Sequence, residues 1–290
     1  MSSLLSYAAW APLAAAHERR VDELTAAHRE RRKGGRSHPV EDFLFTYYSH
    51  RPRLLRRWHP GVGVGLEDAA EHAGWPLYRT VDGAAEVDLA LFLQKRATTV
   101  RFIRSLLAAT ADRPPTLGCF GLHEWAMVYR AGDVRHEDWP LRLGSTGTDE
   151  VVERHTVRCS HYDAFRFFTE DARPRNTVQP TREQQVALEQ PGCLHAGMDL
   201  YKWAYKLSPA VPSALVLDCF ELARDVRVLD MEASPYDLSE LVYQPVRNET
   251  PEGKAEYVRR QKEFATRGQA LRARLIAVCD DILKADVPIS

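Results

Sequence analysis

Helical periodicity of apolar residues is the feature that most restricts how this chain of 290 residues can fold. In residues 88–111, apolar side chains recur every three or four positions, and Pro114 and Pro115 end the pattern. The apolar positions are Leu89, Phe92, Leu93, Val100, Ile103, Leu106 and Leu107. This spacing places them on one face of an α-helix. The segment therefore predicts a long helix that packs against other helices.

Similar patterns predict helices along most of the chain. They cover residues 13–33, 38–48, 121–130, 181–190, 194–207, 212–231 and 251–285. The last begins with Thr250, Pro251 and Glu252, residue types that are favoured at a helix cap and first turn. Residues 150–159 alternate in polarity and are rich in valine and threonine, which predicts a strand. We therefore expect a mainly α fold, a single helical domain of residues 1–290 with a small β element.

The composition is that of a soluble globular protein, with 44% hydrophobic and 27% charged residues. A net charge of −1 gives no overall field that would attract nucleic acid or an anionic membrane. The five cysteines are widely spaced, which indicates reduced thiols rather than a disulfide framework or a zinc ribbon. The mildly apolar segment 4–16 contains Pro12 and predicts neither a signal peptide nor a membrane span. We expect a cytoplasmic protein without membrane contact.

A local excess of positive charge lies towards the N-terminus. Residues 19–57 contain eleven arginines or lysines and five acidic residues. Such a segment is either the solvated face of helices or a surface that contacts phosphates. The sequence leaves both interpretations open.

Three short stretches combine titratable and aromatic side chains at high density. They are residues 118–130, 158–168 and 192–205, and each contains a cysteine, a histidine, a carboxylate and large rings. A sequence selected only for folding rarely mixes these groups so closely. We therefore predict that the three stretches form the walls of one pocket.

Acid–base catalysis is one use of these residues. Asp163 lies between Tyr162 and Phe165, and Glu124 precedes Trp125. A carboxylate beside aromatic rings loses hydration of its charged form, which raises its pKa towards a value useful for proton transfer. The predicted catalytic residues are Asp163, Glu124, His123, His161, His195 and Asp199.

A metal site is the alternative use of the same side chains. His195 and Asp199 are four residues apart and share one face of a helix, and imidazole and carboxylate are ligands for zinc, iron or manganese. The alternative metal ligands are His123, His161, His195 and Asp199, with iron or zinc as cofactor. Their spacing matches no common signature such as HExxH, so the leading prediction assigns neither metal nor cofactor. Cys119 and Cys193, each between a glycine and a histidine, are further candidates as nucleophiles.

The three stretches, with residues 38–48 and 234–238, resemble a family of actinobacterial proteins of similar length named 3-methyladenine DNA glycosylase. The resemblance extends from about His38 to Gln269. It implies a DNA-repair N-glycosylase that removes an alkylated purine from double-stranded DNA by carboxylate-assisted hydrolysis. A flipped, electron-poor base would stack between aromatic rings, and basic side chains would hold phosphates. The residues then expected to bind substrate are Trp125, Tyr129, Tyr162, Phe165, Arg158, Arg166 and Lys202.

Two other functions stay open. One is a helical metalloenzyme, an iron-dependent oxidase that acts on a small molecule through the same histidines and carboxylates. The other is a ligand-binding protein without catalysis that uses the aromatic pocket. Salt-dependent binding to duplex DNA favours the glycosylase, and stoichiometric metal favours the metalloenzyme. The oligomeric state is not predicted.

Overall fold

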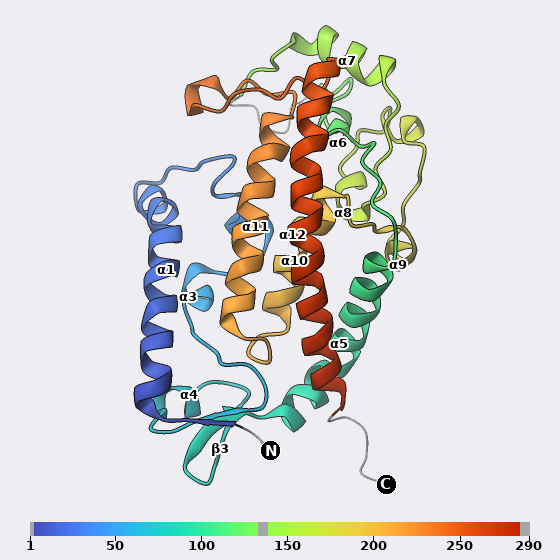
Figure 1. Cartoon of the computed structure of the whole chain (residues 1–290). Coiled ribbons are helices and arrows are strands. Elements are labelled where there is room, and N and C mark those ends of the chain that lie inside the picture. Colours follow the sequence, from blue (N-terminus) through green and yellow to red (C-terminus); the bar gives the residue numbers. More distant parts are fainter. Residues whose placement is uncertain (1–2, 133–138, 285–290) are drawn as a thin grey trace.

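The computed structural model describes residues 3–132 and 139–284 (Figure 1). Within these residues the chain is mainly helical, with twelve helices, 58% of residues in helix and a small four-stranded sheet. The predicted fold class, mainly α with a small β element, is therefore confirmed.

Four long helices form the centre of the molecule (Figure 1). They are α5 (Leu89–Ala111), α10 (Leu194–Lys206), α11 (Ser213–Glu232) and α12 (Pro251–Lys284). Helix α10 packs on α11 and α12, and α5 packs on α12. Each contributes apolar side chains to one buried core, for example Leu106, Leu200, Phe220 and Leu275. Burying a side chain of this kind stabilises the fold by about 1.5–3 kcal/mol.

Helix α1 (Tyr7–Lys33) lies along the outer side of α11 (Figure 1). Two short helices, α2 (Phe43–Tyr47) and α3 (Pro52–Leu55), follow and pack against α11. Arg51 and Pro52 open α3, and the proline ring there fits a position whose N–H has no helical acceptor. These segments bring aromatic side chains from the N-terminal part of the chain to the long helices.

A small sheet closes one end of the helical bundle, near the N-terminus in Figure 1. Its strand order is β1 (Ser3–Leu5), β2 (Val64–Leu66), β4 (Ala84–Val87) and β3 (Tyr78–Val81). Strands β1 and β2 are parallel and the other pairs are antiparallel. Asp82 and Gly83 join β3 to β4 with φ values of 49° and 84°, which the left-handed turn of a tight hairpin requires. The short helix α4 (Ala70–Ala73) packs against this hairpin.

Irregular chain with short helices covers the other side of the bundle (Figure 1). Its helices are α6 (Leu122–Ala126), α7 (Gly144–Arg154), α8 (Tyr162–Phe165) and α9 (Gln185–Leu188), with a 3-10 turn at Arg173–Arg175. A second 3-10 turn, at Ser239–Leu241, lies between α11 and α12. Two of the three dense stretches, residues 118–130 and 158–168, lie in this part and face α10 and α11. This part of the chain therefore positions most of the candidate site.

Several predicted elements are shorter in the structure, and one is wrong. The helices predicted at 38–48, 121–130 and 181–190 contract to α2, α6 and α9, and α12 is described to Lys284, so that Ala285 lies outside the described residues. The strand predicted at 150–159 is instead the second half of α7, followed by a single bridge between Val157 and Asn176. Thr148, Val151 and Val152 are buried at helical spacing, and their burial outweighs the alternating pattern. No helix in the described ranges combines the length and apolarity needed to cross a membrane.

Gly253 supports the start of α12 against the preceding loop. A Cβ atom at this position would lie 1.9 Å from the backbone oxygen of Arg247, which cannot move aside as a side chain can. We expect Gly253→Ala to lower the free energy of unfolding by about 2–3 kcal/mol, measured by urea denaturation. The control is Gly268→Ala in the same helix, where the nearest contact is Leu200 at 3.6 Å. Inside a helix alanine is more favourable than glycine by about 1 kcal/mol, so Gly268→Ala should not lower the free energy of unfolding. Equal losses of stability in both variants would contradict the role assigned to Gly253.

Candidate functional site

A cavity of about 320 Å³ lies where the three dense stretches approach one another. Glu124 from α6, Asp163 from α8 and His195 from α10 all line it. Helices α2, α8 and α11 complete the wall, together with the residues that follow α6 and α8. The lining residues they contribute are Phe43, Thr46, Tyr47, Met127, Ala164, Phe167 and Arg227. At least one residue from each predicted stretch therefore faces a single cavity, large enough for a small ligand.

Two groups of histidines and carboxylates lie beside this cavity. The first cluster consists of His123, Glu124, His195 and Asp230, and the second cluster consists of His161, Glu189 and Asp199. In each cluster, one potential ligand atom per residue lies within 4.8 Å of all the others, and every member is buried.

The two clusters adjoin through histidine rings. The ring of His195 lies 4.6 Å from that of His123 and 5.3 Å from that of His161, measured between ring centroids. His195 thus connects the clusters and also reaches the cavity wall.

Hydrogen bonds fix the first cluster. The Nε2 atom of His123 lies 2.8 Å from Oδ1 of Asp230, and its Nδ1 atom lies 3.3 Å from Sγ of Cys119. Arg227, one turn before Asp230 on α11, donates to Asp230 at 2.7 Å and to Glu124 at 3.3 Å. Both ring nitrogens of His123 therefore have partners, so that its rotation is set.

The surroundings shift the protonation of the first cluster. Burial lowers the pKa of His123, but Cys119 and Asp230 outweigh burial and raise it well above its ordinary value. Burial raises the pKa of Asp230, whereas His123, His195 and Arg227 hold it well below its ordinary value. Burial lowers the pKa of His195 to about 3, so this ring is neutral at pH 7 and keeps a nitrogen lone pair. Perturbed titration of this kind is common at functional sites.

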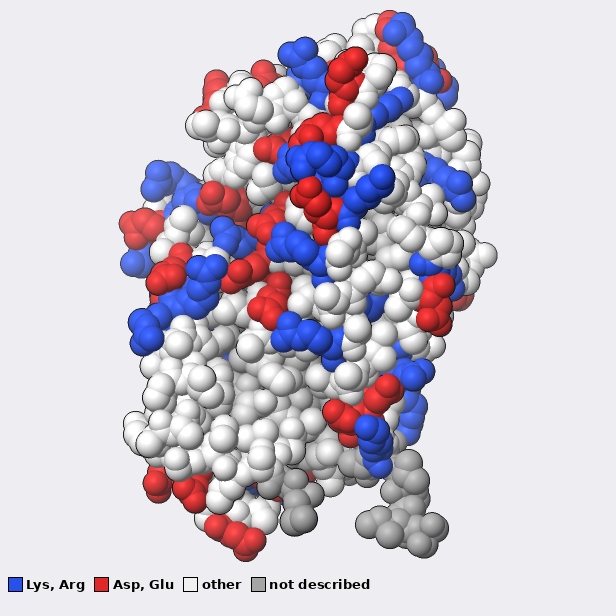
Figure 2. Space-filling model, in the orientation of Figure 1, with Lys and Arg blue, Asp and Glu red and all other residues white. Residues whose placement is uncertain are grey.

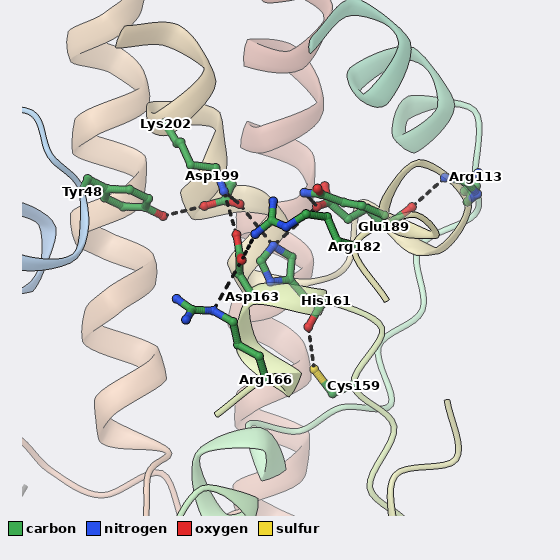
Figure 3. Close-up of polar contacts among 11 residues, drawn as sticks. Tyr48, Arg113, Cys159, His161, Asp163, Arg166, Arg182, Glu189, Asp199 and Lys202 are labelled. Atoms are coloured by element: carbon green, nitrogen blue, oxygen red, sulfur yellow. Dashed lines mark hydrogen bonds and ion pairs between the residues drawn. The ribbon is translucent and has the colours of Figure 1, made fainter. Parts of the chain in front are cut away.

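The second cluster belongs to a polar network around Asp199 and Lys202 of α10 (Figure 3). Asp199 accepts hydrogen bonds from Tyr48 at 2.9 Å and from His161 at 3.2 Å, and it pairs with Lys202. Glu189 lies 3.6 Å from His161, and burial raises the pKa of Glu189. Within the described chain, the buried Nδ1 atom of His161 has no hydrogen-bond partner.

Asp163 has cationic neighbours on several sides. Its carboxylate lies 3.1 Å from Lys202, 3.3 Å from Arg182 and 3.6 Å from Arg166 (Figure 3). Arg166 also lies over the ring of Phe167 at 3.9 Å, on the cavity wall. Asp163 therefore connects the cavity to the second cluster through Lys202 rather than standing alone in an apolar wall.

Among the described residues, the four rings predicted to bind substrate do not line this cavity. Trp125 is fully buried and donates from Nε1 to the backbone oxygen of Ala233, and Tyr129 and Phe165 pack in the core around α6 and α8. Tyr162 lies beneath Arg182 at 5.0 Å. Phe43, Tyr47 and Phe167 supply the rings of the cavity instead. The short helices turn Trp125, Tyr129 and Phe165 into the core, where burial of their rings is most favourable.

The basic residues predicted to bind substrate lie at two different cavities. Arg166 and Lys202 join Asp163 at the cavity, whereas Arg158 lines a different cavity of about 220 Å³ beside Cys119. Cys193, the other candidate nucleophile, is partly exposed, and burial of its sulfur raises the pKa of the thiol. A raised thiol pKa disfavours the reactive thiolate.

Several polar residues that belong to the two clusters or bind them directly were not predicted. They include Tyr48, Glu189, Arg227 and Asp230, and these four lie outside the three dense stretches. Arg227 and Asp230 interrupt an otherwise apolar face of α11, and both are buried. A charged pair three residues apart within an apolar helix face was the available signal, because buried charges require partners.

Ion pairs partly neutralise the basic N-terminal segment, since five of its eleven cations contact carboxylates in the described chain. Arg20 pairs with Glu221, and Arg56 pairs with Glu18 and Asp22. On the face drawn in Figure 2, basic and acidic side chains are interspersed over α1, α11 and α12. These pairs favour the first interpretation of residues 19–57, a solvated helical face.

Comparison of the chain with protein-family models, curated proteins and solved structures gave no match. Inferences about function therefore depend on the geometry and chemistry of the site.

Proposed function

We propose that this chain is a metal-dependent enzyme that acts on a small molecule in the cavity of about 320 Å³. The observation that carries the proposal is the first cluster. Two imidazoles and two carboxylates offer buried ligand atoms within 4.8 Å of one another, and Glu124 and His195 also line the cavity. A catalytic metal site needs both protein ligands and an accessible position beside them.

The donor set suits a divalent transition metal. Imidazole nitrogen and carboxylate oxygen bind iron, manganese and zinc, whereas a calcium site would consist of oxygen donors. Two donors bound to one ion at about 2.1 Å each lie roughly 3 Å apart. The separation of 2.8 Å between His123 Nε2 and Asp230 Oδ1 is close to this value, and a bound ion would replace the proton that these two atoms share in their hydrogen bond. A bound ion would polarise a substrate oxygen or lower the pKa of a bound water.

Protein side chains would position the substrate. The rings of Phe43, Tyr47 and Phe167 would contact its apolar or planar part and exclude water. Asp163, on the same wall, would accept or donate a proton, and its contact with Lys202 at 3.1 Å sets its orientation. Arg227 would hold Glu124 and Asp230 in the geometry that ligation requires.

An N-glycosylase acting on alkylated purines in duplex DNA is the second candidate. It is favoured by the presence of two carboxylates, Glu124 and Asp163, in one aromatic cavity. One carboxylate would stabilise the cationic sugar and the other would activate water, with the base between the rings. The ion pairs of the N-terminal segment count against it, since they occupy arginines that would otherwise contact phosphates.

Metal removal and readdition test the first candidate against the second. We expect chelator-treated protein to gain about 5 °C or more in Tm when excess Zn²⁺, Mn²⁺ or Fe²⁺ is added, because ligands that bind only the folded state stabilise it. Asp163→Asn, which alters the cavity wall outside the first cluster, should keep this gain. No gain with any of the ions, together with release of alkylated bases from DNA by the metal-free protein, would favour the glycosylase.

A further inference from the structure

A second cleft, of about 500 Å³, lies at the opposite end of α10 from the first cluster. Its walls come from α3 and the chain around it, from α5, from the end of α10 and from the segment before β3. Among the residues that the structure describes, the cleft and the cavity of about 320 Å³ share no lining residue. The proposed function gives this cleft no role.

Three cations line the cleft: Arg57, Arg96 and Lys206. Within the described chain, no acidic residue lines it and none of the three cations forms an ion pair. This contrasts with Arg31 and Arg56, each of which contacts two carboxylates. In the described chain, the cleft thus holds two arginines without a carboxylate partner and a third cation, Lys206, whose acidic neighbours, Asp163 and Asp199, lie outside the cleft.

The two arginines are held in place without the help of an anion. Arg96 donates from one terminal nitrogen to the backbone oxygens of Lys206, at 2.7 Å, and Ser208, at 3.0 Å, at the end of α10. Burial lowers the pKa of Arg96, since it disfavours the charged guanidinium. Arg57 lies over the ring of Trp75, 5.0 Å from its centroid. An anion in the cleft would offset the cost of burying Arg96 and would meet side chains that are already ordered.

Flat aromatic rings and neutral histidines also line the cleft. The ring of His50 is stacked on that of Tyr205, with 4.6 Å between centroids. Burial lowers the pKa of His50 to about 4 and that of His59 to about 3. The charged neighbours that act on His59 are Arg57 and three histidines, and all of them disfavour its protonation. At pH 7 both rings are therefore neutral and present nitrogen atoms for hydrogen bonds.

We propose that this cleft binds a small organic anion that carries a planar ring. Its carboxylate or phosphate would lie between Arg57 and Arg96, because a guanidinium matches the geometry of both groups. Its ring would pack against Trp75 or against the stacked pair of His50 and Tyr205. The cleft has the volume usual for small-molecule sites and is too small for a folded partner.

Calorimetric titration of the full chain with AMP and with benzoate tests this proposal. We expect binding of one molecule of at least one probe per chain, weakened at least about tenfold by Arg57→Gln and by Lys206→Gln. Lys206 is exposed and its side chain does not hold the end of α10, so its replacement should leave the fold intact. The control is Arg104→Gln, on α5 but outside the cleft and paired with Asp280.

Each outcome is decisive. Binding of AMP alone identifies a phosphate site, binding of benzoate alone identifies a carboxylate site, and binding of both indicates that either group is accepted. Absence of binding by both probes, or binding that the two cleft variants leave unchanged, overturns the proposal. Binding of duplex DNA that depends on Arg57 and Lys206, without binding of the small probes, also overturns it and assigns the cleft to a nucleic-acid backbone.

Discussion

Replacement of His195 by Gln is expected to lower the affinity for the proposed metal ion at least about 100-fold, because it removes one of four protein ligands. The stability of the metal-free protein should change little. Within the described chain the His195 ring contacts His123 and His161 but forms no hydrogen bond, so its loss leaves no partner unsatisfied. Calorimetric titration of chelator-treated protein measures the affinity.

His155→Gln is the matched control for this variant. His155 is a partly buried histidine whose Nδ1 atom contacts the backbone oxygen of Val151, outside both clusters. The His155→Gln variant should bind the metal ion with the same affinity as the unchanged protein. If His195→Gln bound the ion with unchanged affinity while His161→Gln did not, the ion would belong to the second cluster instead.

Replacement of Arg227 by Met is expected to lower the free energy of unfolding by about 3–5 kcal/mol in the absence of metal. Arg227 is 2% exposed, and its guanidinium contacts the buried carboxylates of Glu124 and Asp230. It also lies 3.8 Å from the ring centroid of Phe43. Without the guanidinium, two carboxylates of the first cluster would be close together in the interior with one fewer cation to compensate them. Urea denaturation of the metal-free protein measures the loss.

Added metal should restore much of the stability of Arg227→Met, because the ion would supply the missing positive charge between the same carboxylates. The control is Arg274→Met, which removes a surface pair with Asp218 at 2.6 Å and should cost less than about 1 kcal/mol. A loss for Arg227→Met no larger than that of the control would contradict the role assigned to the buried arginine. A loss of stability that added metal does not reverse would contradict the proposed metal site.

Local patterns predicted the long helices well. Asp88 caps α5 by accepting from the backbone N–H of Leu91, and α12 begins at Pro251, as the residues before it indicated. The sheet was largely missed because its strands have only three or four residues, too few to show a period. The pair Asp82 and Gly83 was the one local signal for its hairpin.

The site was predictable only in part, for a physical reason. Glu124, Asp163 and His195 could be proposed because dense mixtures of titratable groups and rings stand out in a sequence. Their partners could not be proposed from the sequence, because Arg227 and Glu124, and likewise Asp230 and His123, are more than 100 positions apart in the chain. Which rings face the cavity depends on how short helices pack, and sequence spacing does not determine this.

Elemental analysis of freshly purified protein, prepared without chelators, tests the central claim most directly. The proposed site in His123, Glu124, His195 and Asp230 predicts close to one iron, manganese or zinc ion per chain, and much less in His195→Gln purified in parallel. Less than about a tenth of an ion per chain, with no uptake of any of the three metals on titration, would contradict the account. The clusters would then be hydrogen-bonded acid–base groups, and alkylated DNA would be the substrate to test.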